Sequence, residues 1–137
     1  MFQADDPIQV KVLPGFYEPN NLENRVHTAP VFDFSGSMLA HAPKLPGAWA
    51  RMVAALSKRT IERLQVELAC CVFDTHVVFQ DYAPVPFYLE KPLSVIGGGS
   101  TSLGTALLTV INATRQRRQM LASEGIHSRP AICPVVT

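Results

Sequence analysis

The sequence has few cysteines, and none of them is arranged for metal binding. Cys70, Cys71 and Cys133 are the only three in the 137-residue chain, and no two of them form a C-x-x-C pair. An odd number of cysteines with this spacing argues against a disulfide framework and against a thiolate zinc site. We therefore expect three reduced, buried cysteines.

Charge is also scarce. Asp, Glu, Lys and Arg make up only 17% of the residues, and the formal net charge is +1. So small a net charge excludes a general electrostatic attraction to nucleic acid or to an anionic membrane. Hydrophobic residues reach 47%, which is typical of a packed domain and not of a disordered chain. Any binding must therefore come from a local site.

Targeting and membrane signals are missing as well. No apolar run approaches the roughly 20 residues that a membrane-spanning helix requires. The N-terminus carries Asp5 and Asp6 where a secretory signal has basic residues followed by an apolar segment. We expect a cytoplasmic protein that does not contact a membrane. The chain also has no internal repeat and no low-complexity segment.

Apolar patterns divide the chain into an N-terminal arm, residues 1–29, and a domain over residues 30–137. The arm contains one alternation typical of an edge strand, from Ile8 to Val12. In the domain, apolar runs predict strands over 31–34, 66–73, 77–79 and 131–136, with the middle two paired as a hairpin. Helical spacing predicts amphipathic helices over 46–64 and 103–124.

This order of elements predicts the fold class. Buried strands that alternate with long amphipathic helices are typical of an α/β layer with a mainly parallel sheet flanked by helices. After the hairpin, Pro84, Pro86 and Pro92 predict irregular structure. Pro134 favours an edge position for the last strand, because proline has no N–H to donate.

The loop after the first domain strand carries the main functional signal. Ligands of such sheets bind outside the carboxyl ends of the strands, where Asp33, Ser35 and Ser37 follow one another in alternation. One carboxylate and two hydroxyls are hard oxygen ligands that suit Mg²⁺, and Thr101 in a second, glycine-rich loop adds another hydroxyl. These four groups leave coordination positions open, so an acidic residue of a protein partner could complete the shell.

The same residues resemble the von Willebrand factor A domains. Their metal-ion-dependent adhesion site has the pattern D-x-S-x-S, which Asp33-Phe34-Ser35-Gly36-Ser37 fits. Gly99-Ser100-Thr101-Ser102-Leu103-Gly104 is similar to the family's second loop, and either Ser100 or Thr101 matches its metal-ligating threonine. The resemblance covers about residues 29 to 137. It implies a Rossmann-like fold and a site that binds Mg²⁺, or Mn²⁺, through Asp33, Ser35, Ser37 and Thr101.

Within that family, the chain resembles the bacterial TerY-type proteins of tellurium resistance and stress response. The similarity lies in Gly125-Ile126, followed by Arg129-Pro130 before the last strand. After the strand end that matches Val135-Val136-Thr137, family members continue with Asp-Gly, whereas the sequence of this chain stops at Thr137. We therefore expect a C-terminally incomplete domain that lacks the last acidic group of the site. An incomplete sheet would leave an exposed edge open to oligomerisation.

Two other functions fit parts of the same sequence. The Gly97–Ser102 loop could cradle a phosphate at a helix N-terminus, as in a nucleotide-binding protein, although it lacks the Gly-Lys-Ser/Thr ending of a P-loop. A metal-dependent hydrolase is the other alternative, but neither Ser35 nor Ser37 lies in G-x-S-x-G, and no histidine has the sequence context of a base. We therefore expect a protein-binding module and not an enzyme.

Three features have simpler structural interpretations. Thr101 or Ser102 could cap the helix that follows. Asp74 and His76 are typical of the turn of the hairpin. Arg115, Arg117 and Arg118 are expected to form a solvated helix face, because a nucleic-acid site needs more basic residues than this cluster provides.

Overall fold

The computed structural model describes residues 8–36, 42–89, 91 and 102–136. They form one six-stranded sheet with strand order β1-β5-β4-β3-β6, in which β2 also pairs with β4. The strands are β1 (Val10–Leu13), β2 (Val26–Thr28), β3 (Val31–Asp33), β4 (Val66–Phe73), β5 (Val77–Pro84) and β6 (Val135–Val136). The α-helices are α1 (Leu45–Ser57), α2 (Thr60–Gln65) and α3 (Leu103–Ser123), and short 3-10 turns are η2 (Ala42–Lys44) and η3 (Val85–Tyr88).

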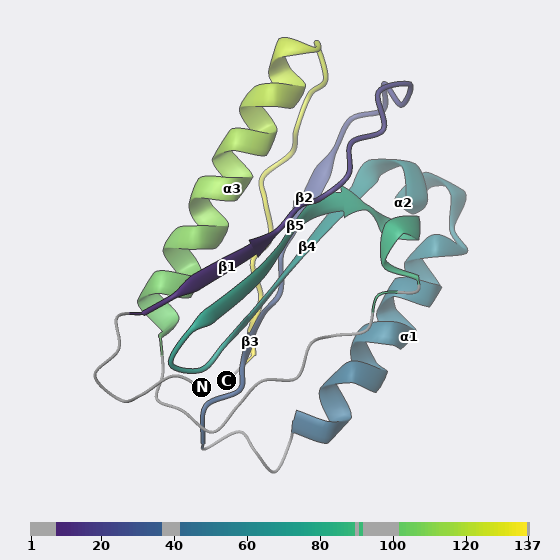
Figure 1. Ribbon diagram of the computed structural model, residues 1–137. Helices are drawn as coiled ribbons and strands as arrows, with labels where there is room; N and C mark the ends of the chain where they lie inside the picture. Colours follow the sequence, from purple (N-terminus) through teal and green to yellow (C-terminus); the bar gives the residue numbers. More distant parts are fainter. Residues whose placement is uncertain (1–7, 37–41, 90, 92–101, 137) are drawn as a thin grey trace.

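The prediction of an α/β fold with a mainly parallel sheet is confirmed. All strand pairs are parallel except the β4–β5 hairpin, which is antiparallel. Helices α1 and α3 lie on opposite sides of the sheet (Figure 1). A parallel sheet requires this cover, because its strands present apolar side chains to both faces.

Side chains of β4 point alternately to the two faces of the sheet and so contribute to two hydrophobic cores. Leu68, Cys70 and Val72 face α1, where they pack with Phe32, Trp49 and Val53. The intervening residues Ala69, Cys71 and Phe73 face α3, where Ala106 and Val110 cover them. Successive side chains of a strand point to opposite faces, so an uninterrupted apolar run is what a strand buried on both faces needs.

The expected helix over residues 46–64 is in fact two helices, so that prediction was wrong in extent. Helix α1 ends at Ser57 and α2 begins at Thr60. The Ser57 hydroxyl donates to the carbonyl of Ala54 at 2.9 Å, a local hydrogen bond that competes with helix continuation. Pro46 lies in the first turn of α1, as expected.

The expectation of irregular structure was also wrong at Pro84 and Pro86, whereas Pro92 lies outside the described residues. β5 extends to Pro84, and Pro86 lies in the first turn of η3. Proline is tolerated at a strand end and at the start of a helical turn, because its missing N–H is not needed there.

Helix α3 agrees with its prediction and is followed by Gly125 at φ 77°, the left-handed conformation that favours glycine after a helix. Ile111, expected on its apolar face, is 49% exposed.

The N-terminal arm contributes two strands to the sheet. The predicted edge strand is confirmed as β1, which pairs in parallel with β5, whereas β2 was not anticipated. Beyond β1, Phe16 N–H donates to the carbonyl of Tyr82 at 3.1 Å. Gly15 permits this close approach, because a Cβ built on it would lie 2.0 Å from the same Tyr82 oxygen.

We expect Gly15→Ala to lower the free energy of unfolding by about 1 to 3 kcal/mol, because the arm would have to move away from β5. Urea unfolding followed by circular dichroism measures the change. Gly104→Ala is the matched control, since no described atom outside the helix backbone lies within 4 Å of the place its Cβ would take, and alanine favours a helix by up to about 1 kcal/mol. Equal effects of the two substitutions would contradict this account of Gly15.

The C-terminal segment runs beside β2 and β3 as an extended chain. Its regular strand, Val135–Val136, is shorter than predicted, but isolated bridges join Arg25 to Ser128 and Thr28 to Ile132. Within the described residues, β6 pairs with β3 alone and so lies at one edge of the sheet.

None of the described helices is both long and apolar enough to cross a membrane.

Candidate functional site

The carboxyl end of β3 places Asp33 and Ser35 together. Asp33 is 6% exposed and Ser35 is 4% exposed. The Ser35 backbone N–H donates to Asp33 Oδ1 at 2.8 Å, and Phe34 N–H donates to the Phe73 carbonyl of β4 at 2.8 Å. These bonds hold the start of the loop against the sheet. Among the described residues, no hydrogen-bond donor reaches the second oxygen of Asp33, Oδ2.

The other two predicted ligands, Ser37 and Thr101, lie outside the described residues, as does Ser100. Their neighbour Ser102 is described: it is buried, and its hydroxyl donates to the carbonyl of Thr75. Ser102 makes no side-chain capping bond to α3. Its bond instead attaches the N-terminus of α3 to the β4–β5 turn.

Asp74 and His76 form the turn between β4 and β5, as their sequence context predicts. His76 N–H donates to Asp74 Oδ1 at 2.9 Å, and Asp74 N–H donates to the His76 carbonyl at 3.0 Å. Gln9 N–H donates to His76 Nδ1 at 2.9 Å, so the turn also holds the residues before β1. Asp74 and His76 are therefore turn residues, as predicted.

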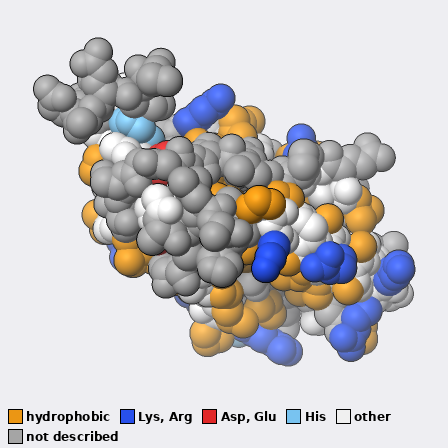
Figure 2. Space-filling view, turned by 90° about the horizontal axis from the view of Figure 1, so that it is seen from below, with side chains coloured by type: hydrophobic (Ala, Val, Ile, Leu, Met, Phe, Trp, Pro, Cys, Tyr) orange, Lys and Arg blue, Asp and Glu red, His pale blue; other side chains and the backbone are white. Residues whose placement is uncertain are grey.

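Asp33, Ser102 and the β4–β5 turn lie together at one edge of the sheet, the edge formed by the carboxyl ends of β3 and β4. Asp33 pairs with Phe73 at the carboxyl ends of β3 and β4, and Ser102 is bonded to the turn that follows β4. In Figure 1 this edge is at the bottom, where α1 and α3 both begin. Figure 2 looks onto it and shows Lys and Arg side chains among hydrophobic ones, with very little acidic surface on the described part.

The described ranges contain no group of three or more His, Cys, Asp or Glu side chains that could hold a metal ion. The predicted site has only one such side chain, Asp33, and its other ligands are hydroxyls. Asp33 nevertheless fits a hard cation, because one of its carboxylate oxygens is held by a backbone N–H and the other receives no such bond from the described residues.

A second group of polar residues, which was not predicted from the sequence, lies near the opposite end of β4. Glu67, the second residue of β4, is 1% exposed. Arg117 binds both of its oxygens, with Nε 3.0 Å from Oε1 and one terminal nitrogen 2.7 Å from Oε2. His27 Nε2 lies 2.9 Å from Oε1, and Arg25 Nε lies 3.7 Å from Oε2. We call Arg25, His27, Glu67 and Arg117 the Glu67 cluster.

The cluster joins distant parts of the chain. Arg117 comes from α3 and also donates to the Phe16 carbonyl of the arm at 2.7 Å. Arg25 donates to the carbonyls of Asn21, at 2.8 Å, and Glu23. The expectation that Arg117 belongs to a solvated helix face was therefore wrong. A glutamate inside the apolar run of β4 was the available sequence signal, because a buried carboxylate requires partners.

These partners determine the ionisation of Glu67. Burial alone raises its pKa, but hydrogen bonds from His27 and Arg117, together with their charges, outweigh burial and lower the pKa from 4.5 to about 2. Glu67 is therefore a carboxylate at neutral pH. Because parallel sheets of this class bind ligands outside the carboxyl ends of their strands, the position of the cluster favours a structural role.

The cysteines agree with their prediction except for one. All three are free thiols, and Cys70 and Cys71 are buried, but Cys133 is exposed. Burial raises the pKa of the Cys71 thiol to about 12 and raises the pKa of Cys70 as well, and partial desolvation raises the pKa of Cys133. No thiol is thus activated as a nucleophile at neutral pH.

Comparisons of the chain with protein-family profiles, with curated proteins and with solved structures found no match.

Proposed function

We propose that this chain is a divalent-metal-dependent protein-binding module of the von Willebrand factor A type. Asp33, Ser35, Ser37 and Thr101 bind Mg²⁺, or Mn²⁺, and an acidic residue of a protein partner completes the coordination. The chain is a TerY-like cytoplasmic protein of bacterial stress response or tellurium resistance, and its role is binding without turnover. The proposal for the partner and the pathway rests on the sequence resemblance.

The position of Asp33 carries the proposal. Its carboxylate lies at the carboxyl end of a central parallel strand, where ligands of α/β sheets bind. Ser35 N–H holds Oδ1 at 2.8 Å and so orients the carboxylate, while none of the described residues binds Oδ2. On the described part of this end of the molecule, Lys and Arg side chains lie among hydrophobic ones (Figure 2), which suits an acidic partner once a metal ion has compensated the charge of Asp33.

Calorimetric titration of Mg²⁺ and Mn²⁺ into the full chain tests the metal site. We expect saturable binding by the natural sequence and a loss of about 100-fold or more with Asp33→Asn, which keeps the size of the side chain but removes its charge. Asp81→Asn is the matched control, because Asp81 is also a strand aspartate whose Oδ1 accepts a backbone N–H, that of Tyr82 at 2.7 Å. It should bind metal normally.

Two results would overturn the proposal. One is no metal binding by a natural chain that circular dichroism shows to be folded. The other is equal metal binding by the natural chain and by Asp33→Asn, which would place any metal elsewhere. Binding of ATP that is unaffected by Asp33→Asn would instead favour the nucleotide-binding alternative.

A further inference from the structure

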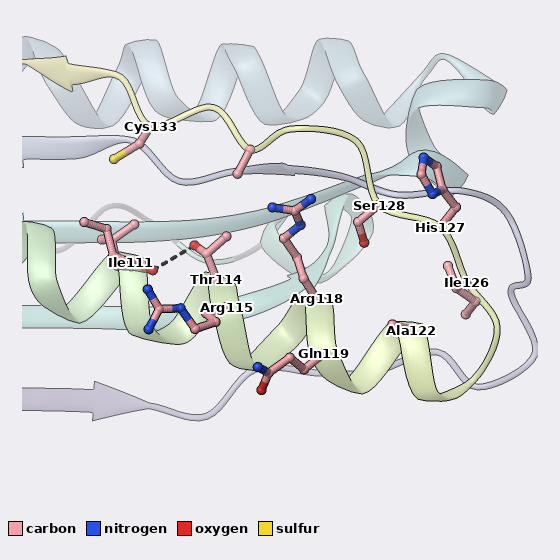
Figure 3. A pocket seen from close by; sticks show the side chains of 12 residues that line it. Ile111, Thr114, Arg115, Arg118, Gln119, Ala122, Ile126, His127, Ser128 and Cys133 are labelled. Atoms are coloured by element: carbon pink, nitrogen blue, oxygen red, sulfur yellow. Dashed lines mark hydrogen bonds between the residues drawn. The ribbon is translucent and has the colours of Figure 1, made fainter.

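A groove lies beside α3, on the face of the sheet opposite α1. It has a volume of about 710 Å³, with α3 as one wall and the segment from Ile126 to Cys133 as the other (Figure 3). Helix α3 packs mainly over β5 and β4, so it leaves the side of this face toward β3 and the C-terminal segment without a helix among the described residues. The groove is the space that a second helix would fill in a fully covered parallel sheet.

Both apolar and polar side chains line the groove. Two cations lie on its α3 side, and Gln119, His127 and Ser128 are among its other polar residues. Val110, Ile126 and Ala131 are among its apolar lining residues, and Ile111 is 49% exposed beside them. Arg115 and Arg118, three residues apart on α3, also line it, whereas no described Asp or Glu does. Figure 3 shows Arg118 reaching from α3 toward the segment that carries Ser128.

These polar groups have no partners within the described part of the chain. Neither Arg115 nor Arg118 makes an ion pair or a side-chain hydrogen bond there, in contrast to Arg117, which binds Glu67. The hydroxyl of Ser128 is buried and also has no hydrogen-bond partner there. The two guanidinium groups are thus left to bind a ligand, whereas the Ser128 hydroxyl is too deeply buried for a docked chain to reach.

We propose that this groove is the docking site for an acidic amphipathic helix of a partner protein. The apolar face of that helix covers Ile111, Ala122 and Ala131, which are exposed, and its carboxylates bind Arg115 and Arg118. Charge complementarity selects an acidic partner, because guanidinium groups form their strongest hydrogen bonds with carboxylates. A helix fits because two helices pack side by side at about 8 to 10 Å. The site lies along the C-terminal half of α3, so it does not depend on Asp33.

The test uses two synthetic peptides of about 18 residues, or about five helical turns. Both carry leucines on one face, and one has glutamates and the other lysines on the opposite face. Fluorescence anisotropy with the full chain should show binding of the glutamate peptide at least about tenfold tighter than that of the lysine peptide. The glutamate peptide should also slow alkylation of Cys133, which lines the groove and is the only exposed thiol of the three.

Charge reversal locates the binding site. The double variant Arg115→Glu with Arg118→Glu should weaken binding of the glutamate peptide by about tenfold or more and strengthen binding of the lysine peptide. Arg51→Glu with Lys58→Glu is the matched control, because these exposed residues lie on and directly after α1 and change the net charge equally. Arg115→Gln with Arg118→Gln provides a milder variant if charge reversal impairs folding.

Three outcomes would overturn the proposal. Equal binding of both peptides, or equal weakening by the α1 control variant, would show general charge attraction only. Binding that leaves Cys133 alkylation unchanged would place the peptide elsewhere. A dimer in sedimentation experiments that dissociates on charge reversal, together with no peptide binding, would assign the groove to a second copy of this chain.

Discussion

Replacing Glu67 by alanine is expected to lower the free energy of unfolding by about 3 to 5 kcal/mol, a large effect for a single substitution. Arg25 is 1% exposed and His27 is 0% exposed, so neither can reach water when the carboxylate is removed. Arg117 would lose both of its bonds to Glu67, which are side-chain hydrogen bonds between α3 and β4. An uncompensated buried cation accounts for most of the expected cost.

Urea unfolding of the natural chain and of Glu67→Ala measures this difference. Glu124→Ala is the control, because Glu124 is an exposed glutamate just after α3 and its removal should change stability by less than about 0.5 kcal/mol. Glu67→Gln should fall between the two, since it keeps a hydrogen-bond acceptor but loses the charge. A loss below about 1 kcal/mol in Glu67→Ala would mean that the cluster does not hold these segments together.

Acid should remove the same stabilisation without any mutation. The pKa of Glu67 is lowered in the folded state from 4.5 to about 2, so the folded chain binds this proton less readily than the unfolded chain does. The resulting stability is present in full above about pH 5, declines as the pH falls and is gone below about pH 2. The difference between these pKa values corresponds to about 3 kcal/mol.

Urea unfolding at a series of pH values from about 7 to about 2 isolates this contribution when the natural chain is compared with Glu67→Gln. The difference between their free energies of unfolding should shrink by about 3 kcal/mol over the acid range. Glu124→Gln should instead follow the natural chain at every pH. A constant difference between the natural chain and Glu67→Gln would show that the Glu67 carboxyl titrates equally in both states.

Local patterns predicted most of the elements. The run Val66–Phe73 was predicted as a strand with the bounds that the structure has, because a strand buried on both faces requires an uninterrupted apolar segment. Helix α3 was likewise predicted from the spacing of its apolar residues, and its end from the glycine that follows it, Gly125. The hydrophobic pattern did not predict two features. One is the end of helix α1 at Ser57, where a local hydrogen bond competes with the helix. The other is strand β2, because its residues His27 and Thr28 are polar.

The candidate metal site was predicted from the sequence in part. Asp33 and Ser35 are two residues apart, so one strand end and its loop suffice to bring them together. The second loop is about 65 residues away along the chain, and the order of strands decides whether it reaches the same edge. The described part of the structure brings its neighbour Ser102 to the turn after β4, while Ser37 and Thr101 themselves stay predictions.

By itself, the sequence determined the alternation of strands and helices and the position of Asp33 at a strand end, because hydrophobic periodicity and turn residues act over short distances. The tertiary structure alone decided that Glu67 would meet Arg25, His27 and Arg117, and that Arg115 and Arg118 would border a groove. All three arginines of α3 look alike in the sequence. Their roles diverge because only Arg117 is placed over a buried carboxylate, 50 residues away in the chain.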